Sequence, residues 1–395
     1  MTTIYDPRYI KLIKHLEKVR KDAKMSQATL AAALGLEQPI ISKVESFDRR
    51  IDIIELHDWL TAIGYSHEKF LQEVGWMEEA INTSLPAIPV PGKAAQTTNA
   101  AGMTGTTIEM AWQGQRREVF IEGLPVAGYL ALENEISKIY KSLNTGTGGK
   151  NREAILAALT RSIEGFPDVN PRDLYHHIVY RIYLRDYTKT QADRSWVRAG
   201  GEAFELFLQG HYNPLLSPYD IELQWLSNDD LRKSALEEMG IHGEVGGSKL
   251  DIALYGKVSS KRVIFGGIHA KLSLAERVSD DVPCSVAMMK KGMVSYLLTL
   301  DAKSFPPPTG DLINRGELGS MSTPSDKRNY IELHGSFDAC FSYNLRTIPS
   351  SGTTASGRKI YVSTFNPAVD PLPAEIVRAW KTFQAKKKQL RRTSA

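Results

Sequence analysis

Apolar residues recur at helical spacing through residues 1–80 and predict a small all-helical unit. A first helix has one apolar face, made by Tyr9, Ile10, Leu12, Ile13, Leu16 and Val19. Two short helices are predicted next, one from the N-cap residue Ser26 to the turn at Gly35, and one over residues 37–45. Pro39 lies in the first turn of the last helix, where proline is tolerated.

The pattern then changes twice along the chain. Residues 81–107 begin with spaced prolines and continue with small polar residues, so we predict a flexible linker there. Residues 108–195 contain amphipathic stretches at 124–143 and 152–163 and predict a helical subdomain. The last segment, residues 196–395, contains strand-like stretches.

Within that domain, two apolar stretches predict a β-hairpin. Residues 249–255 and 262–271 have strand character, and the segment 256–261 is a suitable connection. Antiparallel pairing would bring Asp251 and Lys271 together at the open end of the hairpin. A carboxylate that holds a divalent cation, beside an ammonium group that orients water, suits phosphodiester hydrolysis.

The residues of this hairpin resemble the PD-(D/E)XK nucleases, in which an Asp is followed on the next strand by an acid, any residue and Lys. Asp251 and Lys271 match the pattern, whereas His269 stands where the second acid is expected. The resemblance implies catalysis by Glu205, Asp251 and Lys271, with Mg²⁺ held by Asp251 and Glu205. Glu205 follows a Gly-Gly and a Phe in the preceding helix, as in many restriction enzymes, and Glu202 is the less favoured neighbour.

The segment after Lys271 resembles the base-reading motif of restriction endonucleases that recognise CCGG, CCNGG or CCWGG. Glu276 and Arg277 match its Glu-Arg pair, and Ala275 replaces its first arginine. Glutamate accepts from cytosine N4, and arginine donates a fork to guanine O6 and N7. The resemblance therefore implies that Glu276 and Arg277 read neighbouring C and G bases; the alternative is an exposed charged pair in a first helical turn.

Residues 196–371 are similar to the BsaWI-type endonucleases of this CCGG-reading group. Some enzymes of the group carry a second acid on the helix after the lysine, but the corresponding segment Pro283–Ser285 has no carboxylate. Asp280 and Asp281 lie nearby but out of register and are interpreted as a helix-start or turn acid pair rather than as metal ligands. Asp301-Ala302-Lys303 also has the acid-x-Lys spacing, and we rank it second because it precedes a triple-proline loop.

The helices predicted over residues 26–45 resemble the helix-turn-helix of the lambda-repressor/Xre family. Gln27 matches a position that contacts the DNA backbone, and Gln38, Ser42 and Lys43 fall on the groove-facing side of the second helix. The alternative is a helical bundle used for dimerisation or for docking on the nuclease domain.

Composition permits this interpretation without selecting it. The 395 residues carry a formal net charge of +4, and the two cysteines offer neither a disulfide framework nor zinc spacing. We find neither an apolar run of membrane-spanning length nor a signal-peptide core, so we expect a cytoplasmic protein without a membrane partner.

The sequence thus predicts a multidomain protein with an all-α helix-turn-helix domain, a helical subdomain and an α/β PD-(D/E)XK nuclease core. We expect a Mg²⁺-dependent Type II restriction endonuclease that cleaves double-stranded DNA at a palindromic site containing CCGG or CCNGG. It would be a homodimer, and its system would include a cognate methyltransferase that is not a binding partner. The alternatives are a transcriptional regulator and a nuclease fold that binds DNA without cutting it.

Overall fold

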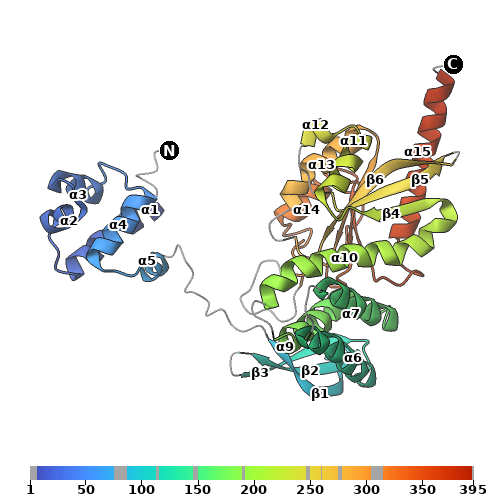
Figure 1. Cartoon of the computed structure of the whole chain (residues 1–395), viewed down its shortest axis with the longest axis horizontal. Coiled ribbons are helices and arrows are strands. Elements are labelled where there is room, and N and C mark those ends of the chain that lie inside the picture. The colour runs from blue at the N-terminus through green and yellow to red at the C-terminus, as the bar shows by residue number, and fades with distance from the viewer. Residues whose placement is uncertain are drawn as a thin grey trace. The chain divides into compact units, whose positions relative to one another are not determined.

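The chain forms two compact units, residues 1–85 and residues 86–395, each with its own apolar core (Figure 1). The computed structural model describes residues 7–74, 87–112, 115–145, 150–188, 192–245, 250–258, 260–274, 278–303 and 315–393. Among the helices in these ranges, none has both the length and the apolar character needed to cross a bilayer.

The described part of the first unit is helical throughout. Its helices are α1 (Pro7–Asp22), α2 (Gln27–Leu34), α3 (Gln38–Glu45), α4 (Ile53–Ile63) and α5 (His67–Glu73). Ser26 caps α2 by accepting from the Thr29 amide at 3.0 Å, and Gly35 ends it with a left-handed φ of 66°. The predicted helix, turn and second helix therefore lie where the sequence placed them.

The second unit begins with a three-stranded antiparallel sheet that the sequence analysis missed. Its strands are β1 (Ile88–Thr98), β2 (Thr104–Trp112) and β3 (Gln115–Glu122), in the order β1-β2-β3. The linker predicted for residues 81–107 is wrong from residue 88 onward, and the subdomain over 108–195 is not purely helical. Small polar residues can form strands when backbone pairing and a few buried side chains, such as Ile108 and Ile121, hold them in place.

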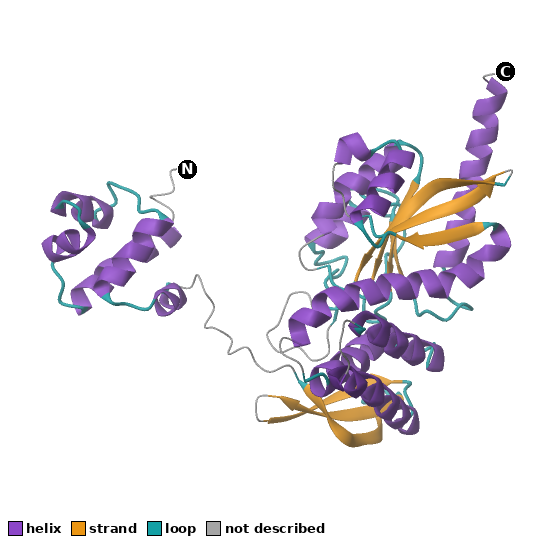
Figure 2. Ribbon diagram, in the orientation of Figure 1, coloured by secondary structure: helices purple, strands orange, loops and turns teal. Residues whose placement is uncertain are grey.

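A layer of helices packs between this small sheet and the rest of the unit (Figure 2). It contains α6 (Val126–Thr145), α7 (Asn151–Gly165), a continuous run of α8 (Pro171–Asp173), the π-helix η2 (Leu174–Tyr180) and α9 (Arg181–Asp186). The long helix α10 (Ala192–Leu216) packs on α7 and carries the chain through the short 3₁₀ turn η3 (Ser217–Tyr219) into the larger sheet.

The larger sheet has six strands in the order β4-β5-β6-β7-β8-β9. The first three, β4 (Ile221–Trp225), β5 (Ile252–Val258) and β6 (Lys261–Lys271), are antiparallel. The others run parallel to β6: β7 (Val294–Thr299), β8 (Ala339–Ser342) and β9 (Lys359–Val362). The predicted hairpin is thus the middle of a mixed α/β sheet.

Helices cover both faces of this sheet. Side chains alternate along β5, so that Ile252 and Leu254 face a core that includes residues of α10 and α15 (Leu372–Thr393). Ala253 and Tyr255 face the opposite core, which is made with α11 (Asp229–Glu238), α12 (His242–Val245) and α13 (Val278–Lys290). The small helix α14 (Asp326–Glu332) contributes Ile331 to a further cluster on the β7–β9 half.

Candidate active site

Asp251 and Lys271 meet at the open end of the β5–β6 hairpin, as the sequence predicts. The Lys271 Nζ atom lies 3.0 Å from Asp251 Oδ2, which also accepts from the Ala270 amide at 2.8 Å. Pairing of Ile252 with Ile268 sets this register. Asp251 is only 6% exposed, so its charge depends on these donors rather than on water.

Glu205 reaches the same cluster from the middle of α10. Trp225 ends β4 and donates its indole N–H to Glu205 Oε2 at 2.5 Å. Burial, and then the negative charge of Asp251, raise the pKa of Glu205 to about 7. The alternative acid, Glu202, pairs instead with Arg198 at 2.9 Å and Arg152 at 3.2 Å.

Asp281 is the residue that the sequence analysis undervalued. It is a fully buried carboxylate in the first turn of α13, and its Oδ2 atom lies 3.2 Å from Lys271 Nζ. Its other oxygen lies 3.7 Å from Nδ1 of His269, which is also fully buried. Asp281 does lie at the start of the helix, as interpreted from the sequence, but it is also a buried partner of Lys271, which the sequence analysis did not indicate.

A signal for Asp281 was present in the sequence. On α13, Asp281 shares one buried face with Cys284, Ser285 and Met288, which follow it at helical spacing. A carboxylate on such an apolar face needs a buried partner, and the lysine that ends the preceding strand is the nearest candidate in sequence. The position at which some related enzymes carry the acid, Pro283–Ser285, follows Asp281 on the same helix.

The charges of this cluster depend on each other. Burial alone would lower the pKa of Lys271, but the carboxylates of Asp251 and Asp281 outweigh it and raise that pKa above its usual range. Burial alone would raise the pKa of Asp281, but His269 and Lys271 hold it below its usual range. Lys271 is therefore a permanent ammonium, suited to donating hydrogen bonds and neutralising charge rather than to accepting a proton.

The carboxylates suit a hard divalent cation. Oxygen ligands from one or two carboxylates, completed by water and substrate phosphate, are the usual environment of Mg²⁺. Glu205 and Asp251 offer such oxygens, and a cation between them would offset the repulsion that raises the pKa of Glu205. Within the described ranges, no three His, Cys, Asp or Glu side chains are grouped closely enough to form a metal cage, so the fit is to two carboxylates.

The rival triplet Asp301-Ala302-Lys303 serves another purpose. The Asp301 carboxylate is fully buried and accepts from the Thr347 hydroxyl at 2.6 Å and the Glu317 amide at 2.5 Å. Burial raises its pKa to about 6. Both of its oxygens accept hydrogen bonds from residues of the following loops.

The predicted base-reading residues Glu276 and Arg277 lie outside the described residues. Their described neighbours are fixed, because Leu274 and Val278 are buried in one apolar cluster. In the first unit, Gln38 and Lys43 are exposed on α3, with Ser42 half-buried beside them. The half-buried Gln27 donates to Glu45 at 2.8 Å and accepts from Gln38 at 2.7 Å.

Known restriction endonucleases are similar to this chain. The family model for BsaWI restriction endonuclease type 2 matches residues 224–367, which include Asp251, Lys271 and Asp281. The Type II restriction enzyme AgeI of Thalassovita gelatinovora is 53% identical over 223 residues, which span 55% of this chain and 80% of that protein. The chain belongs to the BsaWI/AgeI family of Type II restriction endonucleases.

Solved structures extend the comparison. A crystal structure of the specific AgeI–DNA complex matches this endonuclease with a TM-score of 0.62 and 43% identity, over 72% of this chain and 99% of that one. The crystal structure of a pre-specific BsaWI–DNA complex matches with a TM-score of 0.34 and 16% identity, over 66% of this chain and 95% of that one, which is too remote to carry an argument. The family membership favours a nuclease over the transcriptional regulator that the sequence left open.

A first prediction concerns Asp281. The Asp281→Asn variant of this endonuclease should cleave DNA about 100-fold more slowly, because Lys271 loses one of its two carboxylate partners. Single-turnover cleavage measures the effect, with Asp280→Asn as a control because Asp280 is exposed on the same helical turn. Equal rates for the two variants would show that Asp281 has no part in the active site.

A second prediction concerns pH. If Glu205 binds the cation as a carboxylate, cleavage at limiting Mg²⁺ should increase as the pH rises through about 7, since the proton on Glu205 then competes with the metal. A higher Mg²⁺ concentration should move this rise in the cleavage rate to lower pH. Trp225→Phe should move it to higher pH, because the indole N–H lowers the pKa of Glu205. If neither change moves the rise in cleavage rate, Glu205 does not bind the cation as a carboxylate.

Proposed function

We propose that this endonuclease hydrolyses both strands of double-stranded DNA, with Mg²⁺, at a palindromic site containing CCGG or CCNGG. The observation that carries the proposal is the Lys271 ammonium held between the carboxylates of Asp251 and Asp281, with Glu205 beside them. The AgeI relative is named as a Type II restriction enzyme and was crystallised with DNA, which supports duplex DNA as the substrate here.

The chemistry follows from the charge states of these side chains. Asp251 and Glu205 would hold the cation, which supplies positive charge at the phosphate and lowers the pKa of bound water. Lys271 would donate to the attacking water and orient it toward phosphorus. The new P–O bond would form as the bond to the leaving deoxyribose oxygen breaks, with the water losing a proton to solvent and the deoxyribose oxygen taking one up. Asp281 orients the ammonium group of Lys271, which remains protonated throughout because its pKa is raised.

Base selection is assigned to Glu276 and Arg277. They follow Lys271 closely in sequence, so a helix that begins there would enter the major groove beside the scissile phosphate. Glutamate would accept from cytosine N4 and arginine would donate to guanine O6 and N7. Because a palindrome presents the same bases to both halves of a two-fold dimer, we propose that the enzyme acts as a homodimer.

The first unit is proposed to be a second DNA-binding module. Gln38, Ser42 and Lys43 on α3 would face the groove. The Gln27 amide group, held by Glu45, carries a second hydrogen for a phosphate oxygen. We expect the whole enzyme to act in the cytoplasm beside a methyltransferase that protects the host site.

Digestion of unmethylated phage-length DNA tests the main proposal. The purified chain with Mg²⁺ should give discrete fragments whose sequenced ends share a CC…GG core, and EDTA should prevent cleavage. Asp251→Ala and Lys271→Ala should abolish cutting yet keep DNA binding, because they remove the reaction centre and not the binding surface. Intact DNA bound by the unaltered protein would instead establish a nuclease fold that does not cut.

A separate experiment tests the first unit within the full chain. Lys43→Ala should weaken DNA binding in EDTA and reduce the slope of log affinity against log salt by about 1. Lys21→Ala is a control of equal charge change, since Lys21 is exposed on α1 and pairs with Glu17. Identical salt slopes for the two variants would favour the helical bundle that docks or dimerises.

A further inference from the structure

Glu317 is a buried carboxylate that touches the segment leaving the catalytic strand. One of its oxygens accepts from the Ser273 hydroxyl at 2.6 Å and from the Leu274 amide at 2.9 Å. Its other oxygen accepts from Lys327 Nζ at 2.9 Å. Because Glu317 is only 3% exposed, these donors replace the water that the carboxylate loses on folding.

The same segment is held along its whole described length. The Leu300 amide donates to Lys271 O at 3.2 Å, and the Ala302 amide donates to Leu272 O at 3.1 Å. Glu317 then accepts hydrogen bonds from the next two residues, Ser273 and Leu274. The chain is thus fixed residue by residue from the catalytic lysine to the last described position before Glu276 and Arg277.

The backbone of Glu317 is itself held in place by a neighbouring residue. Its amide donates to Asp301, and the preceding Gly316 adopts a φ of 98° that favours glycine. A Cβ atom at Gly316 would lie 2.2 Å from Asp301 Oδ2, so a side chain there would separate Asp301 from Glu317. The buried Asp301 carboxylate therefore holds the loop that carries Glu317 in place.

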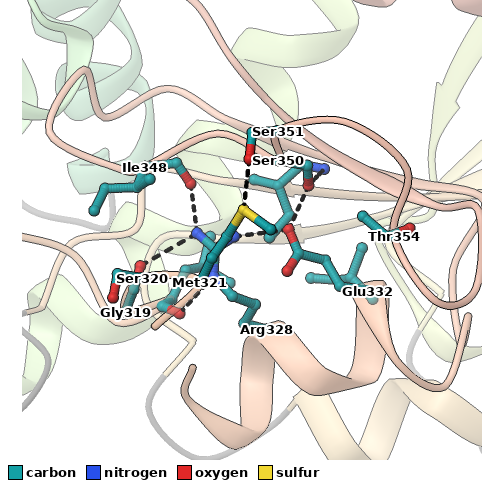
Figure 3. Close-up of polar contacts among 12 residues, drawn as sticks. Gly319, Ser320, Met321, Arg328, Glu332, Ile348, Ser350, Ser351 and Thr354 are labelled. Carbon is teal, nitrogen blue, oxygen red and sulfur yellow. Dashed lines mark hydrogen bonds and ion pairs between the residues drawn. The ribbon is translucent and has the colours of Figure 1, made fainter. Parts of the chain in front are cut away.

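Arg328 clamps the loop that follows Glu317 (Figure 3). This fully buried guanidinium donates to Leu318 O at 3.1 Å and Gly319 O at 3.2 Å, and also to Ile348 O. Glu332 balances its charge at 2.7 Å. A loop secured by a charged pair and several carbonyl groups gives Glu317 little freedom to move with respect to Ser273.

From these contacts we infer that Glu317 is a specificity-determining positioning residue: its carboxylate fixes Ser273 and Leu274, and so sets where the chain enters the base-reading residues Glu276 and Arg277. The inference rests on the proposed base reading. Bidentate hydrogen bonds to base edges tolerate little displacement, so loosening this anchor should reduce discrimination between the correct site and a site with one changed base pair.

The test uses the full-length enzyme and a duplex carrying the site found by digestion. The kcat/KM for this duplex is divided by that for a duplex with one inner G·C pair replaced. Glu317→Ala should reduce this ratio by about tenfold or more, because two hydrogen bonds to the segment are lost. Glu317→Gln keeps an acceptor oxygen for Ser273 and Leu274 and should retain most of the ratio.

Two variants guard against trivial explanations. Glu222→Ala is the matched control, since Glu222 is an exposed glutamate on β4 paired with Arg262 at 3.2 Å; its ratio should not change. Ser273→Ala removes one of the two hydrogen bonds and should give an intermediate ratio. Thermal melting shows whether Glu317→Ala folds. If that variant does not fold, the ratio measured for Ser273→Ala tests the inference in its place.

Combining Glu317→Ala with Arg277→Ala separates this inference from the proposed function. If Glu317 acts through the base-reading residues, it should have little further effect on the ratio once Arg277 is removed. A reduced ratio in Arg277→Ala with an unchanged ratio in Glu317→Ala overturns this inference alone. An unchanged ratio in Arg277→Ala overturns the base-reading proposal, and a reduced ratio in Glu317→Ala would then show that Glu317 acts by another route.

Discussion

The contact between Asp251 and Lys271 is the constraint on which the rest of the site depends. It exists because an antiparallel hairpin brings its two ends together in a register set by buried apolar pairs, and it places opposite charges 3.0 Å apart with little access to water. Neither charge would be stable there alone. Asp281 also contacts Lys271, and the negative charge of Asp251 adds to the effect of burial in raising the pKa of Glu205.

Asp281 and His269 show how the site accommodates a departure from its motif. Histidine occupies the strand position where an acid is expected, and a carboxylate from α13 contacts Lys271 in its place. The ammonium group of Lys271 is stabilised by the positions of the negative charges around it, whichever helix or strand carries them. A carboxylate supplied by a neighbouring helix can therefore give the same charge balance as one supplied by the strand.

The parallel half of the sheet supports the segment that leaves Lys271. Its strands end at the same edge as Lys271, and the segments after them carry Asp301, Glu317 and Thr347, which bond to one another and to the chain after the lysine. In the proposed function, catalysis and recognition would depend on adjacent parts of this one hydrogen-bonded edge. The Asp301 triplet illustrates the limit of motif spacing, since its acid and lysine match the pattern while the acid holds a loop.

The sequence by itself determined the elements with strong local signals. Apolar periodicity and caps located α2 and α3, strand alternation located the β5–β6 hairpin, and the hairpin alone implied the meeting of Asp251 with Lys271. Local signals were too weak for β1 and β2, whose small polar residues become strands only through pairing with neighbours. The roles of Asp281, Asp301 and Glu317 were decided only by tertiary structure, because the partners of a buried carboxylate lie on other elements and no local pattern records which side chains the fold brings within hydrogen-bonding distance.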